Sequence, residues 1–199
     1  MLTRARAARP PLPRPSALAG TVHVWRAALQ DWPSSDELLR SVLCGYLDLE
    51  PAEVALRRGA HGKPALGGNR RPETSESGSR RPLHFNLSHS ADLALIAVAD
   101  RDVGIDVELI RPRRSTAFYE EWARHEATVK CLGTGLTGPR PVPEPPVAVR
   151  MLDVEPGFVA ALAVAGEVVP PVRRFPVLRD ASLRLSAFEA AHERQHTKK

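Results

Sequence analysis

Two carboxylates spaced two residues apart in an otherwise apolar run place the tightest constraint on how this chain folds. The run is Val103-Gly104-Ile105-Asp106-Val107-Glu108, in which Asp106 and Glu108 alternate with aliphatic residues. Side chains two apart on a β-strand point to the same face. The run therefore predicts a strand that carries both carboxylates on one face, where they repel each other unless a cation lies nearby.

A second charged pair follows on a segment with the pattern of a helix. Glu126 and Lys130 are four residues apart in the segment 116–132, which is followed by Gly133, a typical residue after a helix. Residues four apart share one helix face. If this helix packs over the strand, Glu126 joins the two strand carboxylates with a lysine beside them. Such an all-oxygen site suits Mg²⁺ bound jointly with a substrate phosphate.

Each of these residues also has a purely structural interpretation. A half-exposed antiparallel strand shows the same alternation, which leaves Asp106 and Glu108 open as solvated surface carboxylates. Glu126 and Lys130 are equally open as an ordinary surface pair, whose stabilisation is only about 0.2–0.5 kcal/mol. The residues alone do not decide between the two interpretations.

Two shorter motifs lie upstream of these segments. They are Gly62-Lys63-Pro64 and Phe85-Asn86-Leu87-Ser88-His89-Ser90. In this order, and followed by the strand and the helix, they resemble the 4′-phosphopantetheinyl transferase superfamily. The resemblance is to the surfactin (Sfp) type in a shortened form, and it covers roughly residues 20–165.

The resemblance implies an enzyme that transfers the 4′-phosphopantetheine group of coenzyme A to a serine of an acyl or peptidyl carrier protein and releases 3′,5′-ADP. It implies Mg²⁺, or alternatively Mn²⁺, as cofactor and coenzyme A as substrate. Carrier proteins of this type serve secondary metabolism, such as polyketide or nonribosomal peptide biosynthesis. The alternatives are a coenzyme-A-binding pseudoenzyme or a non-catalytic partner-binding protein.

The resemblance also assigns the site residues. The metal ligands are Asp106, Glu108 and Glu126, and the catalytic residues are Glu126 and Lys130, since the family lysine contacts the phosphate or assists proton transfer. The residues placed against coenzyme A are Arg40, Lys63, Pro64, Ser88, His89, His125 and Lys130. Of these, His125 stands where the family has a lysine, so its charge depends on pH. Without the motifs, His89 reads as a turn residue and Arg40 as a helix-surface arginine.

The chain departs from the family between the strand and the helix. Relatives carry another helix there, whereas only residues 109–121 intervene here, including Arg111-Pro112-Arg113-Arg114. We expect the three arginines to steer an acidic carrier protein toward the site. A solvated linker run is the commoner fate of such charges and stays open as the alternative.

Composition narrows the class of protein. The net charge of +5 permits nucleic-acid binding, but aromatic residues make up only 5% of the chain and are not interleaved with basic ones, which argues against that partner. Cys44 and Cys131 lack a metal or redox spacing, so we expect buried thiols in a reducing cytosol. No apolar run approaches the roughly 20 residues of a membrane span. We therefore expect a cytoplasmic monomer without a membrane partner.

The predicted fold class is α+β (α/β), with two pseudo-symmetric halves that each pair an antiparallel-rich sheet with a long helix. The long helices are expected at 35–47 and 116–132, with Ser34 or Ser35 as the cap of the first. The predicted strands are 21–27, 83–88, 93–99, 103–109, 147–153 and 158–165. The predicted divisions are a disordered basic arm at 1–20, halves at 21–102 and 103–199, a mobile insertion at 67–82 and a loosely ordered tail at 170–199 with a short helix at 186–195.

Overall fold

The computed structural model describes residues 18, 20–59, 62–67, 82–134 and 146–177. The predicted arm, apart from residues 18 and 20, lies outside the described residues. So do residues 68–81 of the predicted insertion and everything after residue 177, including the predicted short helix. Among the described helices, none is long and apolar enough to cross a membrane.

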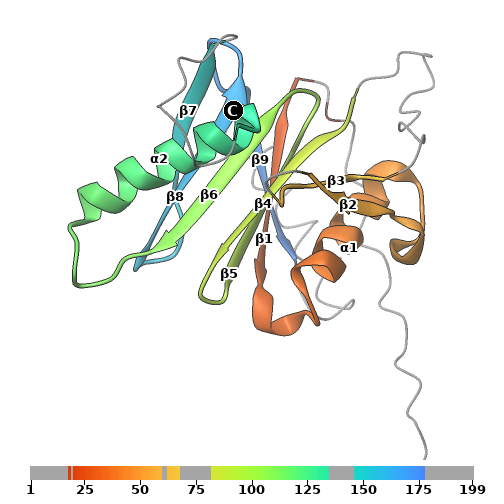
Figure 1. The fold of residues 1–199 in the computed structure, drawn as a ribbon, viewed down its shortest axis with the longest axis horizontal. Helices are drawn as coiled ribbons and strands as arrows, with labels where there is room; N and C mark the ends of the chain where they lie inside the picture. Colours follow the sequence, from red (N-terminus) through yellow and green to blue (C-terminus); the bar gives the residue numbers. More distant parts are fainter. Residues whose placement is uncertain (1–17, 19, 60–61, 68–81, 135–145, 178–199) are drawn as a thin grey trace, which may run out of the picture.

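The described fold has a four-stranded sheet, a three-stranded sheet, a small two-stranded sheet and two long helices (Figure 1). The first sheet has the order β4-β5-β1-β9, with β1 at Val22–Ala28, β4 at His84–Ser90, β5 at Leu93–Ala99 and β9 at Val172–Val177. The second sheet has the order β6-β8-β7, with β6 at Val103–Leu109, β7 at Val147–Leu152 and β8 at Phe158–Ala165. A small hairpin pairs β2 (Leu56–Arg58) with β3 (Pro64–Leu66).

The helices begin and end where their flanking residues dictate. The Ser34 hydroxyl accepts the Glu37 N–H at 3.1 Å and caps α1 (Ser35–Leu47). The Ser115 hydroxyl accepts the Phe118 N–H at 3.3 Å and caps α2 (Thr116–Leu132), which stops at Gly133 with φ +70°. Two 3₁₀ turns, η1 (Leu29–Asp31) and η2 (Pro51–Glu53), flank α1.

Three apolar clusters stack the elements into four layers. One cluster lies between α1 and the first sheet, with Trp25, Leu39 and Phe85 among its members. A second fills the space between the two sheets and includes Val24, Leu95 and Ile105. The third packs small residues of α2 against those of β8, in a set that comprises Ala123, Ala127, Cys131, Val159, Ala161 and Ala163. The order of layers is thus α1, first sheet, second sheet, α2.

Small residues let α2 lie directly on the second sheet. A Cβ atom built on Gly104 of β6 would collide with the carbonyl oxygen of Ala127 and the amide nitrogen of Cys131. It would also lie 3.0 Å from the carbonyl carbon of Lys130. Glycine at this position is what allows the backbone of α2 to approach the strand that carries Asp106.

The predicted fold class is confirmed, and so are the two long helices at 35–47 and 116–132. The loosely ordered tail expected from residue 170 is wrong for Val172–Val177, which form β9 and pair in parallel with β1. The prolines and arginines of this segment favoured the prediction of irregular structure, but β9 is an edge strand, and an edge strand tolerates proline. Phe175 anchors it by stacking on Trp25, with ring centroids 4.7 Å apart.

Candidate active site

A ladder of polar side chains joins the two sheets along the seam between β4 and β6. The Ile105 N–H donates to the Asn86 side-chain oxygen at 2.8 Å, and the Leu109 N–H donates to the Ser90 hydroxyl at 3.0 Å. Between them, the Val107 N–H lies 3.4 Å from the Ser88 hydroxyl. Side chains of β4 therefore satisfy the edge amides of β6 that a neighbouring strand would otherwise take.

Ser88 and Asp106 lie at the centre of this seam. The Ser88 hydroxyl donates to Asp106 Oδ1 at 2.8 Å. The Lys130 ammonium, from α2, donates to the same Oδ1 at 2.5 Å and to the Ser88 oxygen at 3.2 Å. The first sheet, the second sheet and α2 thus each contribute one side chain to a single hydrogen-bonded cluster.

The two remaining carboxylates lie on either side of that cluster. Glu126 Oε2 is 3.3 Å from the Lys130 ammonium, one helical turn away on α2. Glu108 follows Asp106 on the same face of β6, and the Ser90 hydroxyl donates to its Oε2 at 3.4 Å. One ammonium therefore lies within 3.3 Å of two carboxylates, and Glu108 adds a third carboxylate on the same face of β6, so carboxylates outnumber ammonium groups here.

Burial makes the ionised form of Asp106 costly. Removal from water raises the pKa of the Asp106 carboxyl to about 6, against the opposing effects of the Lys130 charge and its hydrogen bond. The second oxygen, Oδ2, is buried and has no hydrogen-bond partner among the described residues. A buried carboxylate oxygen without a partner is unfavourable unless a ligand or cation meets it.

The donor set fits a hard divalent cation that shares its ligands with a substrate. Among the described residues, no three His, Cys, Asp or Glu side chains gather closely enough to hold a metal. Mg²⁺, however, is commonly bound by one or two carboxylates together with water and substrate phosphates. The unpartnered Oδ2 of Asp106 and the adjacent carboxylate of Glu108 are donors of this kind.

Comparison with known proteins shows which proteins this chain is similar to. It is 32% identical over 230 residues to the 4′-phosphopantetheinyl transferase HetI of Nostoc sp. strain PCC 7120, a match that covers 78% of this chain and 93% of the relative. The chain belongs to the 4′-phosphopantetheinyl transferase family. The transferase Sfp of Bacillus subtilis strain 168 is 22% identical over 171 residues, with 65% and 71% coverage.

A third relative matches a shorter part of the transferase. The 4′-phosphopantetheinyl transferase AcpT of Escherichia coli O157:H7 is 48% identical over 102 residues, which cover 38% of this chain and 47% of the relative. No family model matches the chain. The resemblance found in the sequence motifs is confirmed by these relatives, whereas the roles of single residues rest on the geometry.

Lys63 of the transferase reaches α2 from a distant part of the chain. Its ammonium donates to the Lys130 carbonyl oxygen at 2.5 Å, and burial lowers its pKa. Lys63 and Pro64 also line a pocket of about 490 Å³ that extends to Asp102 and Gly133. Lys63 therefore links the predicted coenzyme-binding motif to the backbone of the residue that contacts Asp106.

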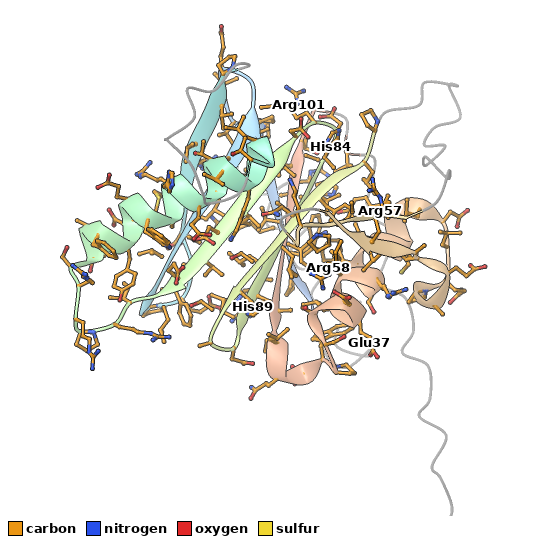
Figure 2. The ribbon with its side chains drawn as sticks, viewed as in Figure 1. Glu37, Arg57, Arg58, His84, His89 and Arg101 are labelled. Carbon is orange, nitrogen blue, oxygen red and sulfur yellow. The ribbon has the colours of Figure 1, made fainter. Side chains whose placement is uncertain are left out.

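The other predicted coenzyme residues lie apart from the cluster around Asp106. Arg40 donates to the Val54 carbonyl oxygen at 2.5 Å, and His125 lies against Trp122 with ring centroids 6.4 Å apart. His89 is exposed and, by alternation with Ser88, lies on the face of β4 toward α1. Figure 2 shows it near the turn between β4 and β5. No described contact joins these side chains to the cluster around Asp106.

Sequence reasoning missed two polar residues of the seam. Asn86 and Ser90 were expected only as parts of a motif, yet both side chains accept amide hydrogens of β6. The signal was present, because Asn86, Ser88 and Ser90 alternate with Leu87 and His89. Such alternation predicts one polar strand face.

Proposed function

We propose that Asp106, Glu108, Glu126 and Lys130 form the active site with which this transferase moves 4′-phosphopantetheine from coenzyme A to a carrier-protein serine. The observation that carries the proposal is the buried Asp106, which is hydrogen-bonded through Oδ1 and has Oδ2 without a partner among the described residues. Charged clusters of this kind serve to stabilise the charge that develops during phosphoryl transfer.

In this reaction the serine hydroxyl of an acyl or peptidyl carrier protein attacks the β-phosphorus of coenzyme A. A new P–O bond forms, the P–O bond to the nucleotide breaks, and 3′,5′-ADP leaves with the electron pair. The serine proton goes to a base in the site. The Glu126 carboxylate is the proposed base, and the Lys130 ammonium is the proposed stabiliser of the transferring phosphoryl group.

The motifs assign Asp106, Glu108 and Glu126 to Mg²⁺, or alternatively Mn²⁺, and of these the unpartnered Oδ2 of Asp106 and the neighbouring Glu108 are the donors that would hold the ion first. When bound, the ion neutralises the negative charge of the coenzyme pyrophosphate. The chain's own contribution is to hold Asp106 in place through Ser88 and Lys130, at 2.8 and 2.5 Å. Support for the ion comes from the excess of carboxylates over ammonium groups in the cluster.

Coenzyme A is proposed to bind along the seam, with its adenine end at the pocket beside Lys63 and Pro64. In this arrangement Ser88, whose hydroxyl donates to Asp106 at 2.8 Å, would lie against the pyrophosphate. Roles for Arg40, His89 and His125 in binding phosphates rest on the motifs. Each is basic, as a polyphosphate ligand requires.

The setting of the reaction is also a proposal. We take the transferase to be a cytoplasmic monomer that serves secondary metabolism and binds neither nucleic acid nor membrane. The buried free thiols of Cys44 and Cys131 support a reducing compartment. Light scattering of the purified chain tests whether it is a monomer, and the same measurement with nucleic acid or lipid vesicles tests whether it binds either of them.

Incubation of the chain with coenzyme A, Mg²⁺ and a panel of apo-carrier proteins tests the function. A carrier that gains the mass of one phosphopantetheine group supports it, and no gain on any carrier contradicts it. Asp106→Ala is expected to abolish the gain, whereas Asp153→Ala, which removes an exposed carboxylate on the opposite edge, is the matched control. If the wild-type chain binds coenzyme A but transfers nothing to any carrier, the alternative of a coenzyme-A-binding pseudoenzyme is supported instead.

A further inference from the structure

Ser88 on β4 joins an amide of the neighbouring strand β6 to a carboxylate of that strand, and the two strands lie side by side (Figure 1). The Ser88 oxygen accepts the Val107 N–H at 3.4 Å and the Lys130 ammonium at 3.2 Å. A hydroxyl group has two acceptor lone pairs and one proton. Because both lone pairs are taken, the proton goes to Asp106 Oδ1 at 2.8 Å. The other oxygen of that carboxyl, Oδ2, is left without a hydrogen-bond partner among the described residues.

Ser90 repeats this arrangement two residues further along β4. Its hydroxyl accepts the Leu109 N–H at 3.0 Å and donates to Glu108 Oε2 at 3.4 Å. Glu108 directly precedes Leu109 in the sequence, just as Asp106 directly precedes Val107. A hydroxyl that accepts one hydrogen bond is polarised and donates a stronger one. Each of the two carboxylates that β6 carries is thus met by a hydroxyl of β4.

The third position of this polar row has a different side chain. Asn86 accepts the Ile105 N–H at 2.8 Å, but the residue before Ile105 is Gly104, which has no side chain. An amide oxygen accepts an N–H as a hydroxyl does. The serines therefore occur where β6 carries a carboxylate, and the asparagine occurs where it carries none. Pairing of the edge amides alone does not require a hydroxyl, so the hydroxyls serve the carboxylates as well.

Glu108 depends on Ser90 more than Asp106 depends on Ser88. Asp106 also accepts a hydrogen bond from Lys130, at 2.5 Å. Within the part of the chain that the structure describes, the Ser90 hydroxyl is the side-chain donor that meets Glu108. A glutamate side chain loses rotamer freedom when it binds a ligand, and a hydrogen bond that already orients it lowers this loss.

We propose that Ser90 is a positioning residue of this transferase, whose hydroxyl holds the Glu108 carboxylate in the orientation in which it meets the divalent cation. The proposal rests on the proposed function, and it adds a residue that the motifs assign neither to the metal nor to coenzyme A. Ser90 acts through Glu108 and supplies no ligand of its own.

Thermal unfolding over a series of Mg²⁺ concentrations, with coenzyme A at one saturating concentration, tests the proposal. A ligand that binds only the folded chain raises the Tm as its concentration rises, so the series gives an apparent Kd for Mg²⁺. Ser90→Ala is expected to raise this Kd about tenfold, the lower end of the usual effect of removing a residue that orients a metal ligand. Ser90→Thr keeps the hydroxyl and retains the wild-type Kd.

The variant Glu108→Gln separates positioning of the carboxylate from a purely structural role of Ser90. In the Glu108→Gln background no carboxylate is left to orient, so the additional change Ser90→Ala leaves the Kd for Mg²⁺ where it was. If Ser90→Ala raises the Kd by the same factor in both backgrounds, the two residues act independently and the proposal is overturned. The Tm of each variant without Mg²⁺ reports any loss of stability of the strand pair itself.

The remaining outcomes are equally distinct. A Kd for Mg²⁺ that is unchanged in Ser90→Ala overturns the proposal, and transfer by the wild-type chain leaves the proposed function standing. If Mg²⁺ does not raise the Tm of the wild-type chain, Glu108 does not serve the ion and the role of Ser90 is refuted with it. Absence of transfer by the wild-type chain on the carrier panel refutes the proposed function whatever the Kd values are, and Ser90 then has no reaction to serve.

Discussion

The contact between Gly104 and α2 makes a stringent test of how the site is positioned. In Gly104→Ala the new methyl group meets backbone atoms of Ala127, Lys130 and Cys131, which cannot rotate away as a side chain can. The helix must move off the strand as a body. Overpacking of this kind costs about 1–3 kcal/mol, and we expect the upper end because only backbone surrounds the site.

The expected change in stability can be measured. A loss of about 3 kcal/mol lowers the Tm by roughly 6–12 °C for a chain of this size. The same displacement carries Lys130 away from Asp106, where the present distance is 2.5 Å. A misplacement of about 1 Å lowers catalytic rates by about 100-fold. Gly104→Ala is therefore expected to lose both stability and kcat.

Thermal unfolding followed by circular dichroism and transfer kinetics on an accepted carrier check this expectation. Gly67→Ala is the matched control, because its new Cβ would meet only atoms of Ala55, the nearest at 3.5 Å, an ordinary contact. The reasoning is refuted if Gly104→Ala unfolds at the same temperature as Gly67→Ala and transfers at the same rate.

Three further predictions concern the charges of the site. Because burial raises the pKa of Asp106 to about 6 in the folded chain, its protonated form favours folding, and the metal-free protein should lose stability as the pH rises from about 4 to about 6. In urea unfolding at a series of pH values, Asp106→Asn should remove this dependence of the free energy of unfolding on pH. The same pH dependence in the wild type and the variant would contradict the prediction. Lys63→Met should lower kcat, because it removes the donor to the Lys130 carbonyl oxygen, and Lys63→Arg should restore part of the activity. An unchanged kcat in Lys63→Met would rule out this positioning role. Replacement of the three arginines in 111–114 by Gln should raise the carrier KM and weaken its salt dependence while the coenzyme A KM stays the same, and an unchanged carrier KM would place electrostatic steering elsewhere.

The parts of the fold that could be predicted are those set by local chemistry. The ends of α2 followed from a run with helical spacing and from Gly133, which adopts φ +70°. The strand that carries Asp106 followed from its alternation, since Val103, Ile105 and Val107 all face the core between the sheets. In each case the residues that decide the structure are neighbours in the sequence.

The parts that could not be predicted depend on contacts between distant residues. β9 was missed because its pairing with β1, rather than its own composition, makes it a strand. The partner of Lys63 is a carbonyl oxygen 67 residues further along the chain, and no local pattern specifies it. The motifs likewise suggested that Asp106, Glu126 and Lys130 lie close together. They do so because Gly104 has no side chain and lets the backbone of α2 approach β6, which no local pattern predicts.

The parallel pair of β1 and β9 has a consequence for how the protein folds. Val22 pairs with Val172, a separation of 172 − 22 = 150 residues. Contacts of such long range close slowly, since the loss of chain entropy precedes the gain from pairing. During synthesis, β1 has no neighbour on one edge until residues 172–177 have emerged, and an exposed edge strand can pair with other chains. The first sheet is therefore completed last, after the strands and the helix that carry Asp106 and Lys130. A fragment that ends at residue 102 should aggregate rather than fold alone.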